Sequence, residues 1–165
     1  MLKKILPFAL GLALLIPTIA GAATIANKQA SPAKAPFATE LKAQRTIIKT
    51  NYDTNQALRV TIKEKVAKIK TLIAEDKAAK TLKDKRETLK SDRAVVKADR
   101  ASLKAIRDTL KPIRDKAKTD KATKDYASLL TDLKAIPNLQ TSKTPILTKL
   151  NSDLDSIITL LSSKS

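Results

Sequence analysis

The chain has 165 residues, enough for one ordinary domain, and carries 33 Lys and Arg against 16 Asp and Glu, a formal net charge of +17. It contains no Cys, no His and no Trp, and its two Gly are Gly11 and Gly21. Without Cys and His, thiol catalysis is excluded and the usual zinc and copper ligands are missing. So few turn formers argue against a sheet protein. We therefore expect an all-α protein that is not an enzyme and holds no cofactor or metal.

The N-terminus has the pattern of a secretory signal peptide over residues 1–22. Lys3 and Lys4 precede an apolar run over residues 5–19, and small residues at 20–22 form a cleavage site. An uncleaved membrane anchor is the alternative, but the run is short for a bilayer, which needs about 20 residues. We expect a secreted or cell-envelope protein, cleaved near Ala22.

The charge of the mature chain stays strongly positive. Removal of Lys3 and Lys4 leaves 31 basic and 16 acidic residues, a net charge of +15. Such a chain favours contact with polyanions, here wall polymers or an anionic lipid surface. Solubility through mutual repulsion is the simpler interpretation. The predicted export signal and the scarcity of aromatic residues disfavour nucleic acid as the partner.

Residues 23–37, which include Pro32 and Pro36, predict a flexible linker. Residues 38–165 predict a helical coiled-coil domain. We expect helices over residues 39–73, 82–118, 123–136 and 145–162, with turns at 75–81 and 119–124. The last two helices form one nearly collinear arm, so the predicted fold is a three-helix, up-down-up antiparallel coiled coil. The alternative is one very long helix over 39–118 followed by a C-terminal helical hairpin.

Local signals refine the predicted helix ends. Thr39 can cap the first helix, and either Asp120 or Thr123 can cap the third. Pro112 predicts a kink or break in the second helix. Thr144 followed by Pro145 predicts a cap and a first helical residue.

Steps of three and four predict the residues that face the core. In the first arm they are Leu41, Arg45, Ile48, Tyr52, Asn55, Arg59, Ile62, Val66, Ile69 and Ile73. In the last arm they are Tyr126, Leu129, Leu133, Ile136, Gln140, Lys143, Leu147, Leu150, Leu154, Ile157 and Leu161. Polar residues within such a row set the register and the choice of partner at some cost in stability.

Residues 86–120 form five blocks of seven, RETLKSD, RAVVKAD, RASLKAI, RDTLKPI and RDKAKTD. Each block begins with Arg and has Lys in fifth place. We call these ten residues the cationic ladder: Arg86, Lys90, Arg93, Lys97, Arg100, Lys104, Arg107, Lys111, Arg114 and Lys118. They predict an anion-binding edge. Alternatively, the arginines pair with acids on neighbouring helices while the lysines face water. The N-terminal half of this helix should pack more loosely than the half that contains Leu110.

The most apolar stretch after residue 22 lies near the C-terminus. We call five of its residues the apolar strip: Leu147, Leu150, Leu154, Ile157 and Leu161. An apolar stripe of this kind is either a docking surface for a partner or unfolded client, or part of the core.

Three stretches, NYDTNQALR at 51–59, SDRAVVKADRASLKA at 91–105 and SDLDSIITLL at 152–161, resemble small secreted Lys-rich helical proteins of Gram-positive bacteria. More distantly, the plan of the chain is similar to periplasmic chaperones of the Spy and CpxP type. Their LTxxQ motif is absent, and the nearest string is LTDLK at 130–134. The resemblance implies a stress-related or surface-structural role.

Three functions follow as hypotheses. The first is a non-enzymatic envelope protein whose basic helices bind anionic wall polymers or membrane surface. The second is a holdase chaperone for extracytoplasmic clients. The third is a structural spacer, in which a homo-oligomer strengthens the thin coiled coil.

Overall fold

The computed structural model describes residues 33–79 and 81–163. Three helical arms of 44, 38 and 37 residues pack antiparallel, and the described residues contain no strand. The all-α, up-down-up prediction is confirmed. The alternative of a single helix over 39–118 is wrong, because the chain turns back after residue 78. The predicted signal peptide and most of the predicted linker lie outside the described residues.

The first arm consists of a short 3-10 helix, η1 (Ala35–Phe37), and the long helix α1 (Ala38–Ala78). A second 3-10 turn, η2 (Thr81–Lys83), leads into α2 (Arg86–Thr123). The third arm consists of α3 (Tyr126–Thr141) and α4 (Lys143–Ser162), separated only by Ser142. The predicted turns are confirmed, although both lie a few residues later than expected.

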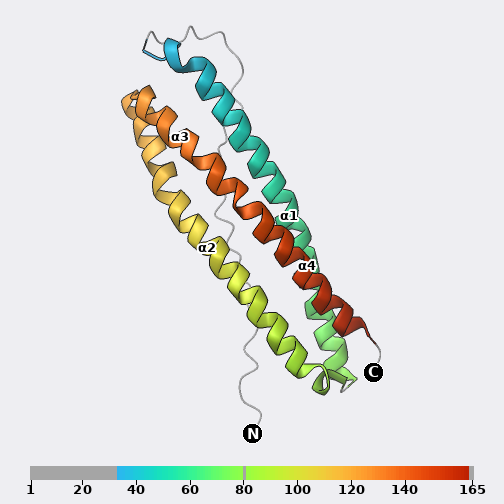
Figure 1. The fold of residues 1–165 in the computed structure, drawn as a ribbon. Coiled ribbons are helices and arrows are strands. Elements are labelled where there is room, and N and C mark those ends of the chain that lie inside the picture. The colour runs from blue at the N-terminus through green and yellow to red at the C-terminus, as the bar shows by residue number, and fades with distance from the viewer. Residues whose placement is uncertain (1–32, 80, 164–165) are drawn as a thin grey trace.

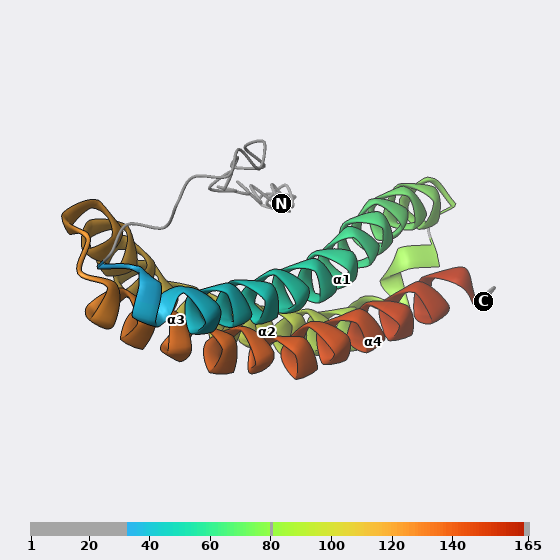
Figure 2. The same ribbon diagram turned by 90° about the horizontal axis from the view of Figure 1, so that it is seen from above.

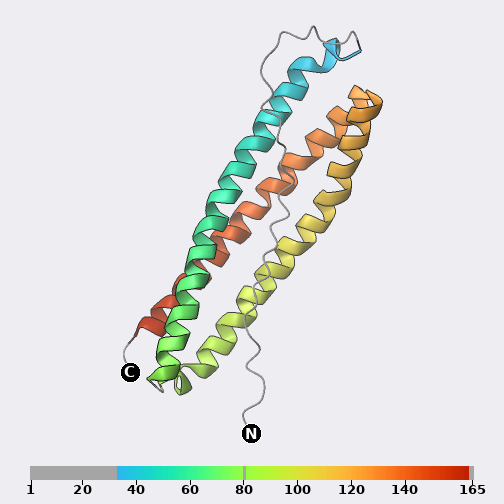
Figure 3. The same ribbon diagram turned by 180° about the vertical axis from the view of Figure 1, so that it is seen from behind.

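The third arm lies between the other two (Figure 1). Both α1 and α2 pack along α3 and α4, whereas α1 and α2 separate as they leave the turn that joins them. From behind, α1 and α2 stand on either side with the third arm seen between them (Figure 3). Figure 2 shows that α1 and the third arm bow in the same direction. The third arm is therefore the central element of the bundle, against which both α1 and α2 pack.

The core is a narrow row of apolar side chains with two clusters. The larger runs from the middle of the bundle to the α1–α2 turn and contains Ile62, Val66, Ile69, Leu89, Val96, Leu147, Leu150, Leu154, Ile157 and Leu161. The smaller, at the opposite end, contains Leu41, Ala117, Leu129 and Leu130, with Phe37 packed against it. Phe37, the last residue of the predicted linker, thus contacts the bundle.

The predicted core row of the third arm is confirmed. Nine of its eleven residues are buried, and the other two, Tyr126 and Leu133, are half-buried. The third arm thus presents one continuous row to the other two arms, from the start of α3 to the end of α4.

In α1 the predicted core row is partly wrong, because Arg45 and Tyr52 are exposed. The preceding residues, Gln44 and Asn51, are half-buried instead. The Asn51 amide donates to the hydroxyl of Thr141 in α3 at 3.4 Å. A row displaced by one residue thus turns two amide side chains toward the third arm, while the larger Arg45 and Tyr52 reach water.

The first half of α2 does not pack more loosely than the second. Leu89 and Val96 are both 3% exposed, close to the 1% of Leu110. Asp92, rather than Arg93, takes the half-buried place between them. Leu89 and Val96 are buried in the larger cluster with apolar residues of α4, and this packing compensates for the polar neighbours.

Two prolines lie inside helices. Of the kink or break predicted at Pro112, the break is wrong, because α2 continues through it, and α3 likewise continues through Pro137 to Thr141. α3 therefore ends at Thr141, later than the predicted residue 136, while the joint at Ser142 lies within the predicted gap between residues 136 and 145. Pro145 lies in the first turn of α4, where the missing N–H breaks no bond within the helix.

The predicted caps are wrong. Thr39 lies inside α1, whose N-cap is Phe37. At the second turn Lys124 adopts a left-handed conformation (φ 62°), and the Asp125 N–H donates to Asp120 O at 2.9 Å. This pattern closes the end of α2. The Asp125 carboxylate accepts from the Ser128 N–H at 3.0 Å and caps α3.

A buried lysine stabilises the α1–α2 turn. Lys85, 6% exposed, lies 3.1 Å from Asp76 Oδ2 and donates to Leu161 O at 3.0 Å and Ser163 O at 2.8 Å. Burial alone would raise the pKa of the Asp76 carboxyl, but hydrogen bonds from Thr81 and Lys85 outweigh it and lower the pKa. This contact ties the end of α4 to the turn.

Candidate anion-binding surface

The cationic ladder lies mostly at the surface of α2. Arg100 and Arg114 are half-buried, and the other eight side chains are exposed. The arrangement follows from the period of seven, because Leu89, Val96, Leu103, Leu110 and Ala117 turn toward the third arm and carry the Arg and Lys positions to the flank and outer face. The ladder is thus an edge beside the core.

Acidic partners of the ladder lie on its own helix. Lys90 pairs with Glu87 at 3.7 Å, and Lys118 pairs with Asp115 at 2.9 Å. A hydrogen bond from Lys104 lowers the pKa of the Asp108 carboxyl. These pairs are exposed, and such pairs contribute little, about 0–1 kcal/mol each. They leave the cations accessible to a competing anion.

The ion pairs that join two helices use lysines outside the ladder. The pairs between helices are Lys134–Glu40, Lys65–Asp155, Lys149–Asp99 and Lys116–Asp132. Asp53 pairs with Lys49 within α1. Arg100 apart, no ladder residue forms a salt bridge to another helix within the described part of the chain. The alternative in which the arginines pair with acids on neighbouring helices is not what the structure shows for these residues.

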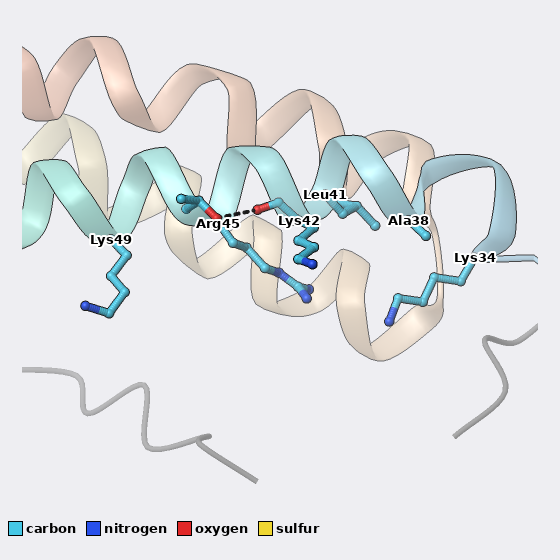
Figure 4. A pocket seen from close by; sticks show the side chains of 7 residues that line it. Lys34, Ala38, Leu41, Lys42, Arg45 and Lys49 are labelled. Atoms are coloured by element: carbon cyan, nitrogen blue, oxygen red, sulfur yellow. Dashed lines mark hydrogen bonds between the residues drawn. The ribbon is translucent and has the colours of Figure 1, made fainter. Parts of the chain in front are cut away.

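Two shallow basic hollows mark the surface. The first, at the start of α2, is lined by three ladder residues and one acid: Arg86, Glu87, Lys90 and Arg93. The second, along the start of α1, is lined by Lys34, Ala38, Leu41, Lys42, Arg45, Thr46 and Lys49 (Figure 4). Its four cations come without an acidic lining residue.

The second hollow was not among the sites predicted from the sequence. Lys42, Arg45 and Lys49 follow one another in steps of three and four, the spacing that places side chains on one helix face. This spacing indicates a basic face on α1, but the predicted core row included Arg45. Figure 4 shows Arg45 and Lys49 extending away from α1.

The apolar strip belongs to the core. Its five residues are each 2–3% exposed and lie in the larger cluster. In this fold they are covered by α1 and α2 and offer no surface to a partner. The apolar surface that motivated the chaperone hypothesis is therefore absent from this part of the bundle.

A buried polar layer lies where α3 meets α4. Asn55 Nδ2 donates to Gln140 O at 2.9 Å, and the Thr144 hydroxyl donates to Asn55 Oδ1 at 3.3 Å. Gln140 Nε2 donates to Ile48 O at 3.2 Å. Asn55 and Gln140 are 5% and 2% exposed. These hydrogen bonds fix the axial register of α1 against the third arm, which is the role predicted for a polar residue in the core row.

Within the described residues, no three His, Cys, Asp or Glu side chains are grouped so that they could hold a metal ion. None of the described helices has the length and apolar character needed to cross a membrane. No protein-family model, curated protein or solved structure matches the chain.

Proposed function

We propose that the protein is a non-enzymatic component of the cell envelope that binds anionic wall polymers or an anionic membrane surface through the cationic ladder. The observation that carries the proposal is the exposure of eight ladder residues whose ion pairs, in the part of the chain that the structure describes, are all with acids of α2. The expected signal peptide supports the location.

Electrostatics gives the proposal its physical basis. The spacing of seven repeats an Arg and a Lys about every 10.5 Å along a helix. A polymer with regularly spaced phosphate or carboxylate groups can contact several of these cations at once, and each contact releases a condensed counterion. Binding of this kind needs no deep pocket, which agrees with the shallow form of the hollow lined by Arg86, Lys90 and Arg93.

The test removes charge from the ladder without touching the core. Arg86, Arg93, Lys97 and Lys111 are exposed, and a fourfold variant replaces each with Gln. We expect its binding to washed cell walls and to anionic-lipid vesicles, measured by co-sedimentation at low salt, to weaken by about tenfold or more.

The matched control removes the same charge from α1. Lys63, Lys68, Lys70 and Lys77 are also exposed, and replacing these four with Gln leaves the same net charge. The control should bind within about threefold of the parent chain, because the changed residues lie outside the ladder. Equal loss in both variants would show that net charge alone drives binding, and the ladder would not be the site.

A further inference from the structure

Lys143 is a buried cation without an acidic partner. It is 6% exposed, at the first residue of α4, and it continues the core row of the third arm. Among the described residues, no carboxylate lies within 4 Å of its ammonium group, and no hydrogen bond joins it to another side chain or carbonyl group. An ammonium in such a place loses part of its hydration, and no hydrogen bond within the described chain replaces it.

Three arginines from the other two arms lie near the level of this lysine along the bundle, since the pairs Lys149–Asp99 and Lys116–Asp132 set the middle of α2 beside the α3–α4 junction. Arg59 lies one helical turn after Asn55, which is bonded to Gln140, so Arg59 stands at the level of Lys143. Arg107 and Arg114 lie on either side of buried Leu110, on the part of α2 that faces the third arm. Arg59 and Arg114 are half-buried, while Arg107 is exposed.

The charges act on one another. Burial, followed by the charges of Arg59, Arg114 and Arg107, lowers the pKa of Lys143 to about 8. Burial also lowers the pKa of Arg59 and of Arg114, and in both cases the nearby Tyr52 acts in the opposite direction. The exposed Tyr52 is thus near enough to act electrostatically on arginines of both α1 and α2.

This gathering of cations destabilises the unliganded bundle. Four positive side chains from three arms lie at this level of the bundle, and within the described residues the one carboxylate paired with any of them is Asp108, 3.4 Å from Arg107 Nε. An aliphatic side chain at position 143 would complete the core row at lower cost. A bound anion with two negative charges would remove the repulsion and satisfy the buried ammonium group.

We propose that Arg59, Arg107, Arg114 and Lys143 form a binding site for a phosphate group at the middle of the bundle. Lys143 would contact the anion from the base, and the guanidinium forks of Arg59 and Arg114 would hold its oxygens from α1 and α2. Tyr52 would add a neutral donor at the rim. The site shares Arg107 and Arg114 with the cationic ladder, but it takes one compact group and adds Arg59 and Lys143, so it does not depend on polymer binding.

The free ion and the phosphate end of a larger molecule share this chemistry. Inorganic phosphate tests the first source and glycerol 1-phosphate the second. The readout is the midpoint of thermal unfolding of the full chain, compared with NaCl at the same ionic strength. A rise with inorganic phosphate alone assigns the site to the free ion, and a larger rise with glycerol 1-phosphate assigns it to a phosphate ester.

Lys143→Met should weaken the apparent affinity by about tenfold or more, because it removes a charge-assisted contact. Arg59→Gln, at a half-buried position, should weaken it in the same direction and guards against a folding defect in the first variant. Lys68→Met removes a charge from an exposed residue of α1 that belongs to neither site and should leave the rise unchanged.

No rise in the parent chain beyond the NaCl value, or an equal rise in Lys143→Met, would overturn the proposal. The two proposals fail separately. The ladder variant with Gln at 86, 93, 97 and 111 keeps the phosphate site and loses wall binding, whereas Lys143→Met does the reverse.

Discussion

At the scale of the residue, Lys143 couples stability to pH. Its pKa is about 8 in the folded chain and about 10.4 in an unfolded one. Between these values the unfolded chain binds more protons than the folded chain, so this residue makes stability rise with pH. Below pH 8 both forms are charged, and the folded state carries the whole penalty.

Lys143→Met should therefore stabilise the ligand-free protein at pH 7, by about 1–3 kcal/mol. The gain should shrink as the pH rises from 8 toward 10.4, where the lysine of the parent chain becomes neutral in both states. Urea unfolding of both chains at pH 7 and pH 10 measures it. A loss of stability at pH 7, or the same gain at both pH values, would contradict the assignment.

Single residues also show how much of the structure could be predicted from the sequence. The exposure of the cationic ladder was predictable, because Arg and Lys rarely enter a core without partners. The burial of Gln140 and Lys143 was predictable too, since both continue the row of Leu and Ile in the third arm. The proximity of Lys143 to Arg59, Arg107 and Arg114 was not predictable, because it depends on the axial register of three separate helices.

At the scale of the element, strong periodicity predicted helices better than their ends. The row of Leu and Ile in the third arm has one possible register, and it was predicted residue by residue. In the first half of α1, two rows of residues one position apart could face the core. One contains Gln44 and Asn51, and the other contains Arg45 and Tyr52. Because none of these four residues is aliphatic, the sequence does not indicate which row is buried. The helix ends depend on backbone geometry at residues 124 and 125, which composition does not reveal.

Replacing Pro112 tests whether this proline destabilises α2, which continues through it. Proline within a helix removes a backbone hydrogen bond and is about 3 kcal/mol less favourable than alanine. Pro112 is exposed, so Pro112→Ala adds a bond without disturbing the core. We expect the free energy of unfolding to rise by about 1–3 kcal/mol, measured by urea denaturation.

Pro145→Ala is the matched control. It makes the same exchange at an exposed position in the first turn of α4, where the proline interrupts no helical bond. Its effect should stay within about 0.5 kcal/mol. If Pro112→Ala left the stability unchanged or lowered it, the continuity of α2 at this position would be in question.

At the scale of the whole molecule, the protein is a narrow three-arm bundle with a positive surface. The third arm holds α1 and α2 through the apolar clusters, the polar layer at Asn55, and the contact of Lys85 with the end of α4. Most acids are paired within this frame, so the excess positive charge falls largely on exposed side chains. The composition already indicated a partner with negative charge, and the fold shows where such a partner can bind.

The salt dependence of binding to washed cell walls tests the central claim most directly. Binding through several ladder cations should make the logarithm of the association constant fall linearly with the logarithm of salt concentration. Between about 50 and 200 mM NaCl the affinity should drop by at least about tenfold, and the slope should be shallower for the variant with Gln at 86, 93, 97 and 111. Retention on the walls that is unchanged across this range, or a slope equal to that of the variant, would contradict the account.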